Sequence, residues 1–334
     1  MTFIIAEAGV NHNGSPELAR KLVLAAKEAG ADAVKFQTFK TENLVTRQAE
    51  KAAYQKVTSD ATESQFEMLK RLEMPDALHY KLRDYCNELG IEFMSTPFDE
   101  DRADFLKELG VQRFKIPSGE ITNFPFLRHV AAKELPMIIS TGMSYLEEVA
   151  AAIDVIRKAG NPPLTVLHCV SNYPAPPETV NLRAMITMRE ELGVPTGFSD
   201  HTMGIEVSVA AVALGATVIE KHFTMDRTLP GPDHAASLEP QEFAAMVRAI
   251  RNVELALGDG VKQPVASEAG TITVIRKGLV AARDIAVGTA LTGDDVAIKR
   301  PASGLPPSAR ESILGRKSRV AIAAGTPLTL ELLA

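Results

Sequence analysis

TVIEKH, at residues 217–222, is the last of eight short apolar runs that alternate along the chain with longer amphipathic stretches. Alternating strand and helix patterns predict βα units around a parallel sheet, and eight such units close a (β/α)8 TIM barrel. An open, doubly wound sheet would use the same units, but the count of eight and the polar residues that end nearly every strand favour the barrel. The other seven predicted strands are residues 3–9, 33–38, 91–96, 113–117, 136–141, 164–170 and 195–200.

The stretch after the first predicted strand has the pattern of an outer barrel helix. Ser15 is a favourable N-cap, and Pro16 suits the first helical position. Five apolar residues then form a single stripe before Gly30, namely residues 18, 22, 25, 26 and 29. We expect this stripe to pack against the barrel.

The chain contains more than one domain. Its 334 residues exceed the usual size of one domain, and the strand–helix pattern stops after a helix predicted at residues 241–257. The turn-rich stretch GDGVKQPVASEAG that follows indicates a linker. Further on, IAVGTALT (285–292) and IAAGTPLT (322–329) are near copies, which predicts a small pseudo-symmetric β-rich module. The predicted parts are a barrel at residues 1–260, a linker at 261–275 and a second domain at 276–334.

Composition predicts a soluble protein of the cytoplasm. Hydrophobic residues make up 46% of the chain, and the formal net charge of -6 gives no electrostatic footprint for nucleic acid. Cys86 and Cys169 are too few for a disulfide framework, which favours a reducing compartment. No segment approaches the roughly 18 apolar residues of a membrane span, and no signal-peptide pattern opens the chain. We therefore expect neither nucleic acid nor membrane as a partner.

Polar residues are dense where the predicted strands end, which is where TIM barrels place their active sites. The set comprises Glu7, Lys35, Gln37, Thr96, Lys115, Ser118, Glu120, Ser171, Tyr173, Ser199, Asp200, His201, Glu220 and His222. These residues are the first candidates for a functional site.

His201 and His222 are the best metal signal in the sequence. They end adjacent strands, so both imidazoles can converge on a divalent ion at the barrel mouth. The alternative is two unrelated, hydrogen-bonded histidines. His12 and His234 lie in loops on the same side and remain candidates, whereas His79, His129 and His168 are expected to be packing or surface residues.

Lys35 and Lys115 lie within strands that should be buried, where an ammonium group requires an anionic partner. That partner is either an anionic substrate or an internal carboxylate. Glu220 lies two residues before His222 on the same strand, so the two side chains face the same side. Glu220 is thus either a general base for water or a group that orients a metal ligand. Hydroxyls at strand ends can donate to phosphate oxygens, although capping of the next helix is the alternative for each.

The motifs at these strand ends together resemble the N-acetylneuraminate (sialic acid) synthase family over nearly the whole chain. They are EAGVNHNG (7–14), VKFQTF (34–39), FMSTPFD (93–99), KIPSGE (115–120), STGM (140–143), LHCVSNYPAP (167–176), GFSDHT (197–202), GATVIEKHFT (215–224) and GPDH (231–234). In that family a TIM barrel precedes a domain similar to type III antifreeze proteins, the SAF domain. VAIKRPASGLPP (296–307) and the internal repeat resemble that domain. Ice binding is not implied, because a fold does not carry a function.

The resemblance implies condensation of phosphoenolpyruvate with N-acetylmannosamine and water, which yields sialic acid and phosphate. It implies a divalent metal cofactor, with Mn²⁺ expected and Mg²⁺ or Co²⁺ as alternatives. It further implies a domain-swapped homodimer in which the small domain of one subunit caps the other subunit's barrel and brings Arg300 to the acyl group of the sugar.

The resemblance also assigns roles to residues. Phosphoenolpyruvate would be held by Lys35, Thr96, Lys115, Ser118, Ser171 and Ser199, the metal by His201 and His222, and the open-chain sugar by Glu7, Tyr173 and Asp233. Some family members have an Asn two residues after the Cys of the sixth strand; Ser171 stands there in this chain, so either Ser171 or Asn172 could fill that role. We expect Glu220, Lys115 and Arg300 to act in catalysis, and Gln37, Glu120 and Asp200 to contact substrate.

Three alternatives remain. A legionaminic acid synthase would perform the same chemistry on a 2,4-diacetamido sugar. A catalytically silent polysaccharide or coat-assembly protein could retain the fold, although a silent barrel need not keep costly buried charges. A Schiff-base aldolase would use a lysine imine and no metal.

Overall fold

The computed structural model describes residues 1–52, 55 and 62–334 of the chain. These residues form two compact units, Met1–Gly258 and Asp259–Ala334. Each unit has a hydrophobic core of its own. The unit boundary falls in the turn-rich stretch that follows the last barrel helix.

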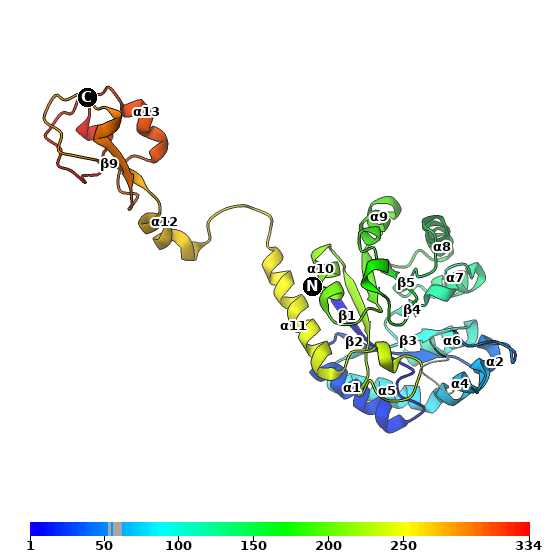
Figure 1. Ribbon diagram of the computed structural model, residues 1–334. Helices are drawn as coiled ribbons and strands as arrows, with labels where there is room; N and C mark the ends of the chain where they lie inside the picture. Colours follow the sequence, from blue (N-terminus) through cyan, green and yellow to red (C-terminus); the bar gives the residue numbers. More distant parts are fainter. Residues whose placement is uncertain (53–54, 56–61) are drawn as a thin grey trace. The chain divides into compact units, whose positions relative to one another are not determined.

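The first unit is the predicted TIM barrel (Figure 1). All its strand pairs are parallel, in the order β3-β2-β1-β8-β7-β6-β5-β4, and β3 packs beside β4 to complete the ring. The strands are β1 Phe3–Gly9, β2 Ala33–Thr38, β3 Glu92–Pro97, β4 Phe114–Ile116, β5 Met137–Ser140, β6 Leu164–Cys169, β7 Thr196–Asp200 and β8 Val218–His222. Each lies within one residue of its predicted position, so the eight-unit interpretation is confirmed.

Helices surround the barrel (Figure 1). Those described in the first unit are α1 Pro16–Glu28, α2 Thr41–Leu44, α4 Gln65–Leu72, α5 Asp76–Leu89, α6 Glu100–Leu109, α7 Phe124–Ala131, α8 Leu146–Ala159, α9 Arg183–Leu192, α10 Glu206–Ala213 and α11 Pro240–Leu257. Helix α1 begins as predicted, with the Ser15 side chain accepting a hydrogen bond from the backbone N–H of Leu18 and Pro16 in the first turn.

Strand alternation divides the barrel into two faces. Residues such as Ile4, Ala6 and Phe36 face outward into the large core between strands and helices. A smaller apolar cluster is formed by Ile5, Ala33, Met94, Ile138, Leu167 and Val218. On β1, β2, β3 and β8 the next same-face residue toward the carboxyl end is polar: Glu7, Lys35, Thr96 and Glu220. The barrel interior is therefore apolar at one level and polar at the next.

The strand register brings these polar residues side by side. Glu7 pairs with Lys35 on one side and with His222 on the other, and Ser199 pairs with Glu220. A β-bulge between Glu7 and Gly9 interrupts the β1–β2 register, and Gly9 has a φ of 50°. The chain thus turns sharply just after Glu7.

The second unit contains the antiparallel pair β9 Gly278–Ala281 and β10 Val296–Lys299, together with α12 Ala269–Ile275 and α13 Arg310–Ile313. The two repeat copies bond to each other, because Ile285 and Ile322 exchange backbone N–H to C=O hydrogen bonds of 2.8 and 2.9 Å. Both isoleucines lie in the core of this unit, as do Leu291 and Leu328 at matching repeat positions. Each copy of the repeat therefore contributes matching residues to one hydrophobic core, in a roughly two-fold arrangement.

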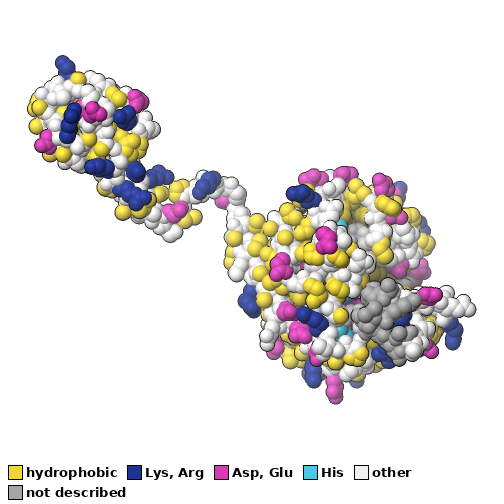
Figure 2. Space-filling model, in the orientation of Figure 1, with side chains coloured by type: hydrophobic (Ala, Val, Ile, Leu, Met, Phe, Trp, Pro, Cys, Tyr) yellow, Lys and Arg dark blue, Asp and Glu magenta, His cyan; other side chains and the backbone are white. Residues whose placement is uncertain are grey.

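Two surface properties complete the description. Within the described part of the chain, no helix is long and apolar enough to cross a membrane. Figure 2 shows acidic and basic side chains dispersed over the visible face of the barrel.

Candidate active site

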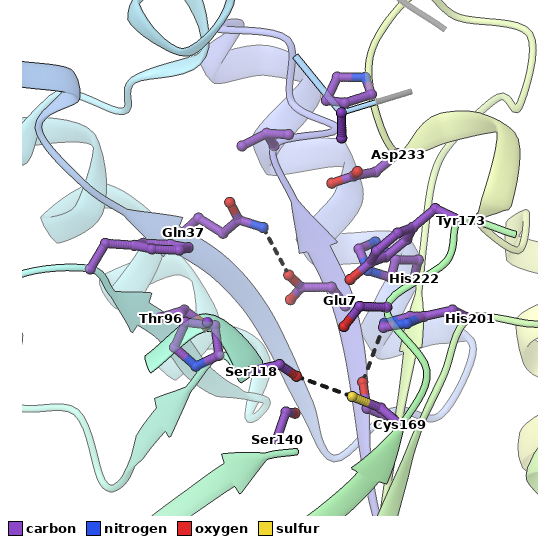
Figure 3. A pocket seen from close by; sticks show the side chains of 18 of the residues that line it. Glu7, Gln37, Thr96, Ser118, Ser140, Cys169, Tyr173, His201, His222 and Asp233 are labelled. Atoms are coloured by element: carbon purple, nitrogen blue, oxygen red, sulfur yellow. Dashed lines mark hydrogen bonds between the residues drawn. The ribbon is translucent and has the colours of Figure 1, made fainter. Parts of the chain in front are cut away.

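A cavity of about 400 Å³ opens at the carboxyl ends of the barrel strands. Residues on or just after all eight strands line it, including most of the sequence-predicted set: Glu7, Lys35, Gln37, Thr96, Lys115, Ser118, Ser171, Tyr173, Ser199, His201, Glu220 and His222. Asp233, from the loop after β8, also lines it. Figure 3 shows Gln37, Thr96, Ser118, Tyr173 and Asp233 arranged around Glu7.

Two lysines and two glutamates form a buried charge cluster at the base of the cavity. Lys35 Nζ lies 2.6 Å from Glu7 Oε2 and 3.6 Å from Glu220 Oε2, and Lys115 Nζ lies 3.4 Å from Glu220 Oε1. Lys35 also donates to Thr96 Oγ1 at 3.0 Å, and Ser199 Oγ donates to Glu220 Oε1 at 2.9 Å. Both lysines therefore have internal carboxylate partners, the alternative to an anionic substrate in the sequence-based interpretation.

The two glutamates of this cluster have pKa values shifted in opposite directions. Burial raises the pKa of Glu7 to about 7, against the opposing attraction of Lys35. Burial acts in the same direction on Glu220, but Lys115 and Lys35 together outweigh it and lower the pKa of Glu220 to about 2. Glu220 is thus an ionised carboxylate held by both lysines and Ser199, which suits an orienting role better than that of a general base.

His201 and His222 lie at the cavity wall with ring centroids 5.3 Å apart. His201 Nδ1 donates to the Val170 carbonyl at 2.6 Å, which leaves the lone pair on Nε2. Among the described residues, His222 Nδ1 is buried and has no hydrogen-bond partner. Burial lowers the pKa of His201 to about 4 and, together with the neighbouring His201, lowers the pKa of His222 well below its ordinary value.

These two imidazoles fit a divalent cation. Both are neutral at physiological pH, as metal ligation requires, and the unpartnered nitrogen of His222 is a polar atom that a cation would satisfy. Among the described residues no group of three or more His, Cys, Asp or Glu side chains could hold a metal. The remaining positions around an ion at this pair would fall to water and substrate oxygens.

Hydroxyl groups surround the lysine end of the cavity. Ser118 Oγ accepts the Gly142 N–H at 2.9 Å and lies 3.2 Å from Cys169 Sγ. Ser140 was not among the predicted site residues; its buried hydroxyl also lines the cavity and has no hydrogen-bond partner in the part of the chain that the structure describes. Its signal was present, because Ser140 ends the fifth strand as the first residue of STGM.

One wall of the cavity is apolar, and sequence reasoning did not predict it. Val10, Met68, Leu69, Leu72 and Phe98 line this side, and all five belong to one small hydrophobic cluster. Three of them come from α4, which follows β2 after a long excursion of the chain. The cavity therefore has a charged end and an apolar side.

Two of the predicted strand-end residues lie away from the cavity. Asp200 points outward and is fully buried, 2.9 Å from Lys221 Nζ, with further hydrogen bonds from Thr202 and Ser208. Its carboxylate is saturated, so the prediction that it contacts substrate is not retained. Glu120 accepts a hydrogen bond from Asn123 and does not line the cavity.

Two residues after the sixth strand, Ser171 and Asn172, were candidates for one phosphoenolpyruvate contact. Ser171 lines the cavity and Asn172 does not. His12 and His234 lie outside the lining residues as well. Arg300 belongs to the second unit, immediately after β10, and its side chain is exposed.

The fold and the site together define a class: a TIM-barrel enzyme with two buried lysines and two neutral imidazoles at the mouth of its barrel. The NeuB family model matches residues 22–262, and the SAF domain model matches residues 276–334. The chain therefore belongs to the NeuB family. It is an enzyme of the sialic acid synthase type, which forms a carbon–carbon bond with phosphoenolpyruvate.

Individual relatives agree with this assignment. The chain is 52% identical to the N,N'-diacetyllegionaminic acid synthase of Legionella pneumophila, over 98% of this chain and 94% of the relative. It is 47% identical to the synthase of the same name from Campylobacter jejuni, over 94% and 95%. A solved N-acetylneuraminic acid synthetase from Leptospira borgpetersenii aligns with a TM-score of 0.71 at 36% identity, over 81% of this chain and 90% of that one.

Proposed function

We propose that this enzyme condenses phosphoenolpyruvate with a 2,4-diacetamido hexose and water, releasing phosphate and a nine-carbon acid of the legionaminic type. The observation that carries the proposal is the cavity itself, which combines a cationic, hydroxyl-rich end, a pair of neutral imidazoles and an apolar wall.

The anionic substrate is assigned to the lysine end. Lys35 and Lys115 are buried, and the hydroxyls of Thr96, Ser118, Ser140, Ser171 and Ser199 line the same cavity. A charge-assisted hydrogen bond from each lysine to a phosphate or carboxylate oxygen would contribute about 1.5–3 kcal/mol. Glu220 keeps both ammonium groups oriented between turnovers.

The cation is assigned to His201 and His222, with Mn²⁺ as the expected ion and Mg²⁺ or Co²⁺ as alternatives. When bound, it would supply Lewis-acid polarisation of the sugar aldehyde. Beside it, Glu7, Tyr173 and Asp233 hold the open-chain sugar so that its aldehyde carbon faces C3 of phosphoenolpyruvate. The C3–C1 bond forms, water adds at C2 and phosphate leaves by C–O cleavage.

The sugar is chosen by two observations. The 52% and 47% identical relatives both carry the name diacetyllegionaminic acid synthase. The wall formed by Met68, Leu69, Leu72 and Phe98 offers apolar contact to the methyl group of a second acetamido substituent. N-acetylmannosamine, which the sequence resemblance implies, is the second candidate because it lacks only that substituent.

We also propose that the enzyme works as a domain-swapped homodimer. In this arrangement Arg300 of one chain reaches the acyl group of a sugar bound in the other chain's barrel. Its planar fork of donors suits an acetamido oxygen.

The test incubates purified enzyme with phosphoenolpyruvate, Mn²⁺ and each sugar separately, and measures phosphate release and product mass. Phosphate release should be fastest with the 2,4-diacetamido sugar, should stop in excess EDTA, and should return with Mn²⁺, Co²⁺ or Mg²⁺. Full turnover in EDTA would contradict the metal assignment.

Two further outcomes separate the other functional classes. Inactivation by borohydride with pyruvate would indicate an imine-forming aldolase instead. No phosphate release with any sugar would favour a catalytically silent protein.

A further inference from the structure

Two carboxyl groups from opposite ends of the barrel sequence face one small space in the cavity. Glu7 ends the inward face of β1, and Asp233 lies in the loop after β8. Gly9 marks the space between them: a Cβ on Gly9 would lie 3.1 Å from Glu7 Oε1, 3.3 Å from Gln37 Nε2 and 3.6 Å from Asp233 Oδ2. Because residue 9 is a glycine with a positive φ, both carboxyl oxygens and the Gln37 amide border one small space beside it.

The two groups differ in their partners. Glu7 Oε2 is bound to Lys35, and Glu7 Oε1 accepts a long hydrogen bond of 3.3 Å from Gln37 Nε2. Asp233 is 7% exposed, and no Lys, Arg or His among the described residues forms an ion pair with it. Figure 3 shows Asp233 and Tyr173 near one another, above Glu7 in this view. Glu7 Oε1, which accepts only this long hydrogen bond, and the Asp233 carboxyl group can therefore both contact a bound molecule.

The proposed sugar substrate creates a need for such a pair. An acetamido hexose in water is a closed ring, a hemiacetal, whereas bond formation to C3 of phosphoenolpyruvate requires the open aldehyde. In the hemiacetal, the hydroxyl O1 and the ring oxygen O5 are both bonded to C1. Ring opening removes a proton from O1 and adds one to O5, so the two groups that transfer these protons must lie close to each other. Glu7 and Asp233 meet that requirement, and they lie next to His201 and His222 in the cavity lining.

We propose that Glu7 and Asp233 open the hemiacetal ring of the sugar as an acid–base pair, so that the enzyme is also a sugar ring-opening catalyst. This inference rests on the proposed function, because it assigns chemistry to the same sugar. One carboxylate removes the proton of O1–H while the other group, as a carboxylic acid, donates its proton to O5.

The step balances without a further reactant. The C1–O5 bond breaks as C1=O1 forms, one proton leaves O1 and one proton arrives at O5, and the two carboxyl groups exchange roles. No electrons are gained or lost. The two carboxyl groups border one small space, and burial raises the pKa of Asp233 to about 6, so the pair can hold a single proton near neutral pH. Ring closure by the reverse step produces either anomer, so the enzyme should interconvert anomers without phosphoenolpyruvate.

The first experiment measures anomer exchange by NMR saturation transfer. It uses the full chain loaded with Mg²⁺, no phosphoenolpyruvate, and either N-acetylmannosamine or the 2,4-diacetamido sugar. Wild type should accelerate exchange, and Asp233→Asn and Glu7→Gln should each reduce the enzymatic rate by about a hundredfold, the usual contribution of a general acid or base. The control is Asp226→Asn, the same substitution in the same loop at an exposed residue that does not line the cavity.

The second experiment separates ring opening from simple sugar binding. A 2,4-diacetamido aldehyde without hydroxyls at C5 and C6 cannot form the ring. Because Asp233 also contacts the open-chain sugar, Asp233→Asn should lose some activity on the open aldehyde, but its loss in condensation of the ring-forming sugar should be about a hundredfold larger. Equal losses on both substrates would overturn the proposal, as would a wild-type enzyme that does not accelerate anomer exchange. Failure of phosphate release with every sugar would instead overturn the proposed function, because the exchange assay contains no phosphoenolpyruvate.

Discussion

Lys35 and Lys115 differ in how many buried carboxylates lose a partner when the lysine is replaced. Lys35 touches both Glu7 and Glu220, whereas Lys115 touches Glu220 alone. Alanine at either position should lower kcat/KM for phosphoenolpyruvate by about ten- to a hundredfold, the value of one charge-assisted hydrogen bond. Steady-state kinetics at saturating sugar would measure this, and unchanged kinetics in both variants would refute the phosphoenolpyruvate assignment. Lys35→Ala should also be the less stable variant in thermal unfolding, since it leaves two buried carboxylates short of a partner.

At the residue scale, the sequence predicted most of the cavity lining, because strand-end polar residues of a TIM barrel converge by construction. Asp200 was predicted wrongly for a simple reason. Alternation along β7 places Ser199 inside, so its neighbour Asp200 faces the helices. Ser140 was missed because one serine at a strand end is equally compatible with helix capping. The acidity of Glu220 depends on distances to two lysines that no sequence pattern contains.

At the scale of elements, β7 and β8 are joined behind the two histidines. Asp200 and Lys221 form a pair with both side chains 0% exposed, and Lys221 Nζ also donates to the Thr202 carbonyl at 2.6 Å. This pair binds the outer faces of the strands that present His201 and His222 on the inner side.

Lys221→Met should therefore destabilise the fold by about 3–5 kcal/mol, because it leaves a buried carboxylate unpaired. Urea unfolding would measure the loss, and Mn²⁺ titration calorimetry should register weaker binding to the folded fraction. The double variant Asp200→Leu with Lys221→Met is the control, and it should recover much of the stability. A single variant as stable as wild type would show that the pair contributes nothing.

Helix α4 carries much of the apolar wall, and Glu73 follows its last turn. Glu73 accepts hydrogen bonds from Lys40, Lys70 and the backbone N–H of Thr41, which ties α4 to α2. Burial opposes its ionisation, but Lys40 and Thr41 prevail and lower the pKa of Glu73 to about 2. A lowered carboxyl pKa stabilises the folded state above the ordinary value of 4.5, and the contribution is lost as the pH falls from there toward 2.

Glu73→Gln should consequently be less stable than wild type at pH 7, and the gap should narrow by pH 3. Urea denaturation of both proteins at the two pH values measures it. A gap that is the same at both values would assign the effect to packing rather than to the ionised carboxylate. The sequence could not predict the position of this apolar wall. The barrel fold does not fix the length or path of the segment between β2 and β3, to which α4 belongs.

At the scale of the whole molecule, the division into two units means that the barrel can be tested without the second unit. Each has its own core, so a chain that ends at Gly258 should fold and bind Mn²⁺ while turning over poorly without Arg300. Circular dichroism, metal titration and phosphate release would measure the three properties. Wild-type turnover by the shortened chain would remove Arg300 from the mechanism.

The exchange of domains between subunits has a direct test in mixed dimers. Arg300→Ala and His222→Ala should each be inactive, and a mixture of the two should regain partial activity, because one of its two sites then contains both His222 and Arg300. Subunit exchange is verified by mass. No recovery after verified exchange would mean that Arg300 serves its own barrel or none.

The exposed, irregular segment that opens the second unit, residues 259–265, has a thermodynamic consequence. A segment this short holds the small unit at an effective concentration in the millimolar range around whatever it is tethered to. An Arg300 loop with very weak intrinsic affinity would then still bind a barrel mouth for much of the time. It would also dissociate quickly, which allows product release. Lengthening the tether with glycine and serine should dilute the loop and slow turnover gradually, without any change to a single side chain of the cavity.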